Sequence, residues 1–182
     1  LLNNKLYSDD YGVSTALDLQ WLSWATVSPR YSVHWKDFKE NSAYPSQFSR
    51  DGAEQSVGVG QNYYTFDNSV VWSLSYDYRW KDADGDQFAL ESHDLGASVS
   101  VSFPDKWNVT TGMTYSEQDY VNYFPFPRRL DDVYGASLVI SRPLWSEKFI
   151  LEMSYNLTTT NSPWDFAEYN RQSFGIAVSY YV

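Results

Sequence analysis

The sequence has no cysteine, which excludes a disulfide framework and thiol chemistry. It has no run of about 18 apolar residues, so a transmembrane helix is excluded as well. Cations are scarce, since 13 Lys and Arg residues stand against 23 Asp and Glu residues. The net charge of −10 argues against nucleic acid as a partner and against docking on an anionic membrane surface. A transmembrane β-barrel stays open, because its lipid-facing and lumen-facing residues alternate and their hydropathies average out.

Aromatic residues, in contrast, are abundant. They make up 19% of the chain, with 16 Tyr and 8 Trp, although the mean hydropathy is only −0.50. Aromatic rings with a polar tip are enriched where an apolar phase meets water. The composition therefore predicts a protein with a large boundary of that kind.

The C-terminal stretch 171–182 shows a two-faced strand pattern. Its apolar side chains fall on every second residue, namely Phe174, Ile176, Val178, Tyr180 and Val182. Most residues between them are small or polar, as in a strand with one apolar and one polar face. The positions Ser173, Gly175, Val178 and Tyr180 resemble the C-terminal targeting strand of bacterial outer-membrane β-barrels. This resemblance implies the barrel assembly machinery as a partner.

The same alternation recurs through nearly the whole chain, in about nine runs. Apolar residues occupy alternate positions over 13–21, 31–35, 57–63, 70–80, 95–103, 107–115, 134–140, 149–157 and 174–182. Together with the polar residues at their ends, the runs reach about ten to thirteen residues and exceed the strands of globular sheets, which have about five or six. They match transmembrane strands, which need about nine to eleven residues. The length therefore favours a membrane-spanning sheet.

The connections between the runs alternate between short and long. Short turns are predicted near Ala25, Asn68, Asp105 and Ser146, and longer polar links over 37–54, 81–93, 117–132 and 158–170. This arrangement is typical of outer-membrane barrels, whose short turns face the periplasm. The sequence predicts an all-β, antiparallel up-and-down transmembrane β-barrel over 1–182. The alternative is a soluble β-sandwich whose core is the same apolar face.

The predicted strand number bears on the extent of the barrel. Bacterial single-chain barrels have an even number of strands, whereas about nine are visible here. At least one strand is therefore expected to be missing, so the chain is predicted to be the C-terminal part of a barrel of ten or more strands. The alternative is a single complete barrel domain of eight or ten strands.

The polar face carries small residues and a few charges. Serine, glycine, threonine and asparagine dominate it, which suggests a lumen wider than that of a filled small barrel. The charged and titratable side chains predicted to point into the lumen are Asp18, Arg30, His34, Lys36, Asp77, Arg79 and Glu152. They either pair with one another or set the selectivity of a pore.

Catalysis has little support in the sequence. His34 and His93 are its only histidines, and His93 and Asp94 fall on opposite faces of a strand, which argues against a catalytic dyad. We therefore predict no enzymatic activity, no cofactor and no metal. A hydrolase at the barrel rim is the less favoured alternative.

Two further segments carry a resemblance. The strand opening Tyr134-Gly135-Ala136-Ser137-Leu138 and the segment Tyr169-Asn170-Arg171 before the last strand resemble the C-terminal barrels of outer-membrane proteins. Among these, barrels attached to periplasmic tetratricopeptide repeats look similar, including surface lipoprotein assembly modifiers and polysaccharide exporters.

The resemblance implies a location and a range of functions. The location is the outer membrane of a Gram-negative bacterium, with membrane lipid and a periplasmic domain or protein as partners. The main expectation is a porin-like channel or export conduit that passes solute or polymer through a polar lumen. The alternative is a non-conducting structural or assembly barrel that anchors a partner.

Overall fold

The computed structural model describes residues 8–38, 51–83, 88–120, 128–144 and 148–180. They form the strands β1 Ser8–Ala16, β2 Leu19–Leu22, β3 Ala25–Phe38, β4 Gly52–Thr65, β5 Val70–Ala83, β6 Leu90–Ser102, β7 Asn108–Tyr120, β8 Arg129–Pro143, β9 Phe149–Asn161 and β10 Tyr169–Tyr180, with the 3₁₀ helix η3 Asp165–Ala167. Within these ranges there is no helix with the length and hydropathy that a membrane span requires.

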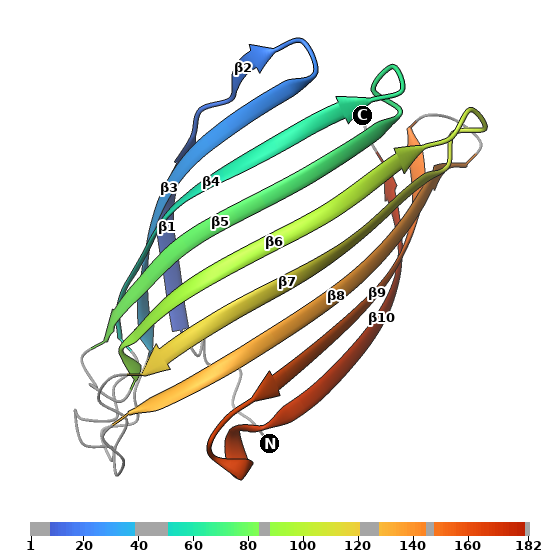
Figure 1. The fold of residues 1–182 in the computed structure, drawn as a ribbon. Coiled ribbons are helices and arrows are strands. Elements are labelled where there is room, and N and C mark those ends of the chain that lie inside the picture. Colours follow the sequence, from blue (N-terminus) through green and yellow to red (C-terminus); the bar gives the residue numbers. More distant parts are fainter. Residues whose placement is uncertain (1–7, 39–50, 84–87, 121–127, 145–147, 181–182) are drawn as a thin grey trace.

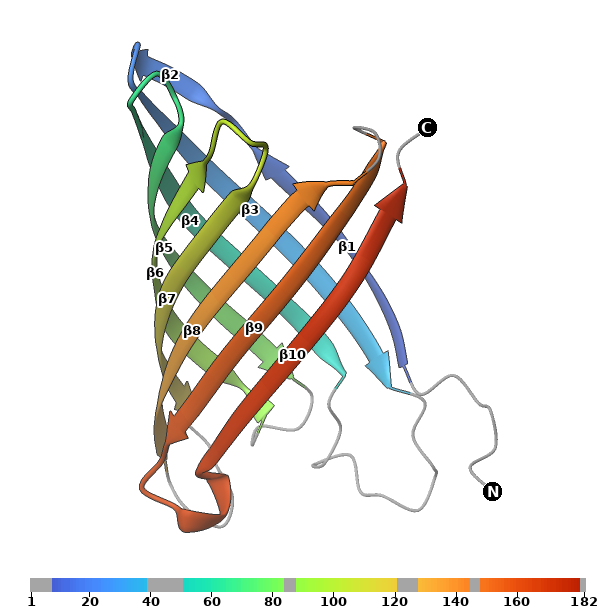
Figure 2. The same ribbon diagram turned by 90° about the vertical axis from the view of Figure 1, so that its right-hand side faces the viewer.

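All described strands belong to one antiparallel sheet. The sheet has ten strands in the order β1-β3-β4-β5-β6-β7-β8-β9-β10, and β2 pairs beside β1 with β3. Figures 1 and 2 show a sheet that curls strongly about one axis, with β1 and β10 as its first and last strands. The predicted all-β, up-and-down antiparallel topology is confirmed.

The first predicted run, 13–21, is divided into β1 and β2. The break at Leu17 and Asp18 lies across from Pro29 of β3, because Ala16 pairs with Arg30 and Leu19 with Val27. Leu17 donates its backbone N–H to the Pro29 carbonyl at 3.1 Å. Proline has no amide hydrogen to donate in return, so the ladder is interrupted there.

The register keeps the predicted apolar positions beside one another from β5 to β10. One row across the strands consists of Trp72, Val99, Thr111, Leu138, Tyr155 and Phe174. A shift of one residue in any pairing would turn a strand's apolar side chains to the opposite face. The predicted facing of the runs therefore agrees across the described sheet.

No described element forms a second layer over the apolar face. Among the described residues, the buried hydrophobic side chains are Ala25 and Ala83, whereas Leu95 is 50% exposed and Phe174 is 68% exposed. A soluble sandwich would bury this face between two sheets. The sandwich alternative is wrong, since the described strands lie in one sheet.

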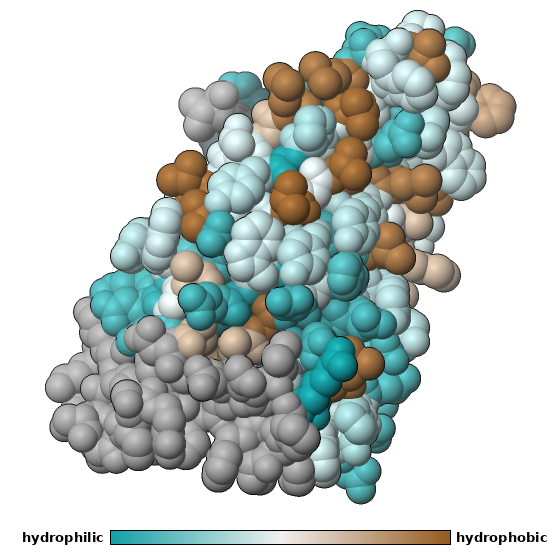
Figure 3. All heavy atoms as spheres, turned by 60° about the vertical axis from the view of Figure 1, so that its left-hand side comes forward, coloured by the Kyte–Doolittle hydropathy of each residue, from teal (hydrophilic) through white to brown (hydrophobic). Residues whose placement is uncertain are grey.

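The two faces differ in exposure as well as polarity. In β6, Leu95 and Ala97 on the apolar face are exposed, while Gly96 and Ser98 on the polar face are half-buried. We infer that the polar face lies on the concave side of the curl. In the view of Figure 3, apolar side chains gather on the part of the surface away from the grey segments. Hydrophilic side chains predominate next to the grey segments.

Strands continue beyond the boundaries that the apolar pattern predicts. The expected links 81–93 and 117–132 are shortened, because β5 runs to Ala83, β6 begins at Leu90, β7 runs to Tyr120 and β8 begins at Arg129. The backbone hydrogen bonds between strands continue after the side chains become polar. The hydropathy pattern therefore does not show where the strands end. The predicted turn at Asn68 is present, with Phe66, Asp67 and Asn68 at positive φ. The turn near Ser146 lies outside the described residues.

The facing of the sheet generates a stability prediction. Val99 lies on the apolar face, opposite Trp72 and Thr111. If that face contacts the bilayer midplane, Val99→Arg lowers the free energy of unfolding by about 2–4 kcal/mol in urea titrations of the folded protein in lipid vesicles. Val139→Arg is the matched control, because Val139 lies on the polar face between Thr110 and Ser154. Its free energy of unfolding should fall by less than that of Val99→Arg. Equal losses would contradict the facing.

Candidate functional site

The centre of the polar face consists of small side chains. A row across β5 to β9 holds Ser75, Gly96, Thr114, Gly135 and Thr158. Beside it, a shallow cavity of about 200 Å³ is lined by residues that include Ser73, Ser98, Gly112 and Ser137. Short hydroxyl side chains leave space and offer both donors and acceptors. The centre of the face is therefore polar and carries few bulky side chains.

A bidentate ion pair crosses β4 on this face. Arg30 and Asp77 lie on β3 and β5, and both are in register with Gly58 on β4 between them. Arg30 Nε donates to Asp77 Oδ1 at 2.7 Å, and its second contact joins Nη2 to Oδ2. A Cβ at residue 58 would overlap the Asp77 carboxylate. Glycine is therefore required for the two charged groups to meet over β4.

Arg79 connects three side chains nearer the long-loop end, which is the end of the sheet where the longer links join β3 to β4, β5 to β6, β7 to β8 and β9 to β10. Its guanidinium lies 3.4 Å from Glu54 Oε1 and 3.4 Å from Asp94 Oδ2, and Nε donates to Ser92 Oγ at 3.1 Å. Ser92 is fully buried and donates to Asp94 at 3.2 Å. The arginine is thus balanced by two carboxylates from β4 and β6.

The remaining predicted lumen residues form smaller groups. Asp10 Oδ1 lies 3.8 Å from His34 Nδ1, and Asp10 Oδ2 lies 3.9 Å from Lys36 Nζ. Asp18 accepts a hydrogen bond from Ser28 Oγ. Glu152 is in register with Ser141 and Ala177 and makes no ion pair among the described residues.

Two of these groups contain residues that the sequence pattern does not identify. Glu54 falls in a predicted link, and Asp94 borders one, although both lie on strands and contact Arg79. Asp10 precedes the first predicted run and lies on β1. Continuing each predicted strand a few residues past its apolar segment, with the same alternation of faces, would have identified these three residues.

A small cavity of about 300 Å³ lies at the long-loop end between β7, β8, β9 and η3. Arg129 Nε lies 2.9 Å from Asp131 Oδ2, and the Arg129 guanidinium sits 3.9 Å from the centre of the Tyr120 ring. Asp131 is 3% exposed and Thr160 is 5% exposed. Neither Asp131 Oδ1 nor Thr160 Oγ1 has a hydrogen-bond partner within the described ranges.

The histidine beside Asp94 lies on the other face. His93 Nδ1 is 2.8 Å from the Tyr76 hydroxyl, and the His93 ring lies 5.1 Å from the Tyr78 ring. Asp94 contacts Arg79 on the polar face. The two side chains are therefore separated by the sheet, as predicted. The lack of enzymatic activity stays a prediction.

The proposed targeting residues lie on β10. Ser173 and Gly175 are on the polar face, opposite Asn156 and Ser154 of β9. Val178 is 59% exposed and Tyr180 is 56% exposed on the apolar face, where the Tyr180 ring lies 4.8 Å from that of Phe149. This arrangement matches their predicted facing, and their targeting role stays a prediction.

A comparison with protein families identifies the chain's relatives. The model of a family described as surface lipoprotein assembly modifier matches residues 1–181. The chain belongs to this family. The match confirms the resemblance to surface lipoprotein assembly modifiers drawn from the sequence, and the family's description does not name a porin. No curated protein matches the chain at a significant level.

The ion pairs at the long-loop end generate a second prediction. Asp131→Ala removes the carboxylate from an arginine whose side chain is 14% exposed, so the free energy of unfolding should fall by about 3–5 kcal/mol. Asp119→Ala is the control, because its partner Arg128 is 64% exposed and solvent screens that pair. Urea unfolding followed by tryptophan fluorescence measures both. A loss at Asp131 no larger than that at Asp119 would show that the buried pair is not stabilising.

Proposed function

We propose that this chain is the β-barrel region of a surface lipoprotein assembly modifier and lies in the outer membrane of a Gram-negative bacterium. The observation that carries the proposal is the family match over 1–181 together with a single sheet whose apolar face is uncovered. Soluble monomers rarely expose so large an apolar surface. A hydrocarbon environment accounts for it without a second layer.

The proposed substrate is a surface lipoprotein, whose polypeptide must pass a layer that cannot hydrate its backbone. The polar face of the sheet offers serine and threonine hydroxyls to such a segment, with few bulky side chains at its centre. Its principal arginines are balanced by carboxylates, as in the Arg30–Asp77 pair and the Arg79 group. Paired charges leave little net electrostatic potential that could select between cations and anions. These features favour an assembly barrel over a porin-like channel.

The barrel itself is part of the proposal. We infer that residues 1–182 form one barrel domain or the C-terminal part of a larger one, in which β1 and β10 meet each other or further strands. Unpaired edges in hydrocarbon would leave backbone groups without partners, so the sheet must close. Membrane lipid, the barrel assembly machinery and a periplasmic domain or partner protein complete the proposed set of partners.

Display of a lipoprotein on intact cells tests this function. The gene encoding the chain is expressed or deleted in a Gram-negative strain that carries an epitope-tagged surface lipoprotein, and protease accessibility of the tag is measured. We expect the tag to become protease-sensitive on intact cells only when the protein is present. Equal sensitivity with and without the protein would contradict the proposal, and lysed cells control for tag integrity.

Conductance distinguishes the assembly barrel from the channel. We expect the purified protein to insert into planar bilayers without a steady open-pore current, because passage of a lipoprotein does not require a permanently open lumen. A steady current that changes its ion selectivity in Arg79→Ala would instead support the channel. The oppositely facing variant Trp80→Ala serves as the control for nonspecific effects on insertion.

A further inference from the structure

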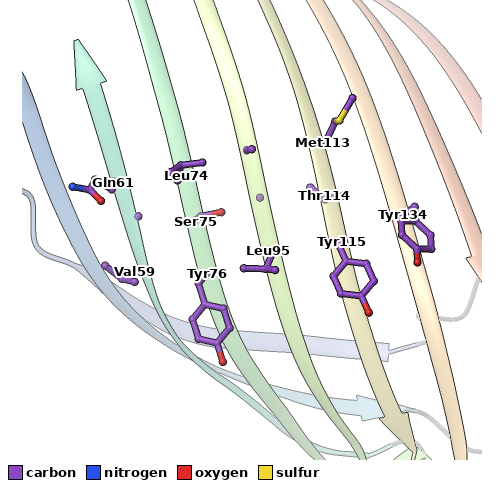
Figure 4. A pocket seen from close by; sticks show the side chains of 13 residues that line it. Val59, Gln61, Leu74, Ser75, Tyr76, Leu95, Met113, Thr114, Tyr115 and Tyr134 are labelled. Atoms are coloured by element: carbon purple, nitrogen blue, oxygen red, sulfur yellow. The ribbon is translucent and has the colours of Figure 1, made fainter.

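The apolar face contains a groove across β4 to β8. Its volume is about 630 Å³, within the range of about 300–1,000 Å³ that ligand pockets occupy. Its walls include Leu74, Tyr76, Leu95, Met113 and Tyr134 (Figure 4). Because these side chains lie on the apolar face, the groove is separate from the polar face described above.

The groove arises where small residues interrupt rows of large ones. Ala97 is in register with Leu74 on one side and Met113 on the other, so it leaves a depression between them. Gly60 and Gly96 lie below this surface and add no side-chain bulk. Met113 is 73% exposed beside the depression, and its flexible thioether can adapt to a neighbouring chain.

The two ends of the groove differ in chemistry. The body is lined by hydrocarbon, whereas the hydroxyls of Tyr76, Tyr115 and Tyr134 point toward the same end in Figure 4. Two of these hydroxyls are held in place: that of Tyr76 is 2.8 Å from His93 Nδ1, and that of Tyr115 donates to Asp132 at 2.7 Å. A ligand with a hydrocarbon tail and a polar head matches this polarity.

The row beyond the tyrosines restricts the head group. It consists of Tyr78, His93, Glu117 and Asp132 in register. The next row holds Glu91 and Asp119, and Asp119 pairs with Arg128, so the repulsion of an anionic head group rests on Glu91, Glu117 and Asp132. Carboxylates disfavour the phosphate of a phospholipid by like-charge repulsion. The anchor of a bacterial lipoprotein carries its acyl chains on a glyceryl-cysteine without phosphate, so it avoids this repulsion.

We propose that this groove binds one acyl chain of a lipoprotein's lipid anchor while the polypeptide engages the polar face. The inference rests on the proposed function. An acyl chain is stabilised by burial among apolar groups, so moving it from the hydrocarbon side to the serine-lined face would cost free energy. The sheet thus keeps the two parts of the substrate on its two faces, tail outside and polypeptide inside.

Photocross-linking tests the groove directly. Cells make the tagged lipoprotein with a diazirine fatty acid in its anchor, and the protein is irradiated in intact membranes and its cross-linked peptides are mapped. We expect cross-links on β5, β6 and β7 in the wild type. Ala97→Trp fills the depression and should lower this yield by about tenfold, since excluding about two methylene groups from an apolar site has that effect on affinity.

The control variant lies in the same row of the sheet. Ala136 pairs with Met113 on the apolar face but does not line the groove, so Ala136→Trp adds the same ring and should leave the yield unchanged. Ala97→Leu supplies a milder filling if the tryptophan variant does not assemble, which heat-modifiable electrophoretic mobility reports. An unchanged yield in the filled variants, or cross-links from phospholipid alone, overturns the acyl-chain site.

The outcome separates this inference from the proposed function. If the wild type exposes the lipoprotein on the cell surface but groove filling changes neither display nor cross-linking, the groove proposal fails and the assembly function stands. If display does not depend on the protein at all, the assembly function fails. Reduced display in Ala97→Trp together with lost cross-links supports both.

Discussion

Cross-strand register is the constraint on which the rest of this molecule depends. The pairings from β1 to β10 place most apolar side chains beside apolar ones and most polar side chains beside polar ones, so two faces of different polarity result. No core of packed apolar side chains supports the described sheet, whose buried hydrophobic residues are two alanines. The sheet is held together by backbone hydrogen bonds between strands and by cross-strand side-chain contacts. Its apolar surface requires an apolar environment to cover it.

The same register determines the chemistry of the polar face. Arg30 meets Asp77 because both are opposite Gly58, and Arg79 meets Glu54 and Asp94 because their strands are neighbours. Arg30 and Arg79 are therefore neutralised across strands, whereas Glu152 makes no ion pair among the described residues. Hydroxyl groups occupy much of the face between these charged groups. A polar, sparsely filled face whose arginines Arg30 and Arg79 are paired with carboxylates suits contact with many polypeptide sequences better than selection of one ion.

Family membership and the two faces lead to one account of function. A lipoprotein combines a polar chain with a hydrocarbon anchor, and this sheet presents one surface suited to each. In the proposal above, the groove at Ala97 holds the anchor, and the carboxylates of Glu117 and Asp132 beyond its tyrosines disfavour an anionic head group. Under this proposal, substrate recognition and membrane residence both depend on the same alternation of side chains.

The sequence by itself determined the fold class and the facing of most residues, because an alternation of period two is local and each strand carries it independently. It also placed Val99, Phe174 and Arg79 on their observed faces. It did not determine where strands end, since Glu54 and Asp94 are polar residues on a continuing ladder. Nor did it show the division at Pro29, the partners of Asp131 or the groove around Ala97. These depend on which residues of different strands become neighbours, and only the pairing of strands in the tertiary structure decides that.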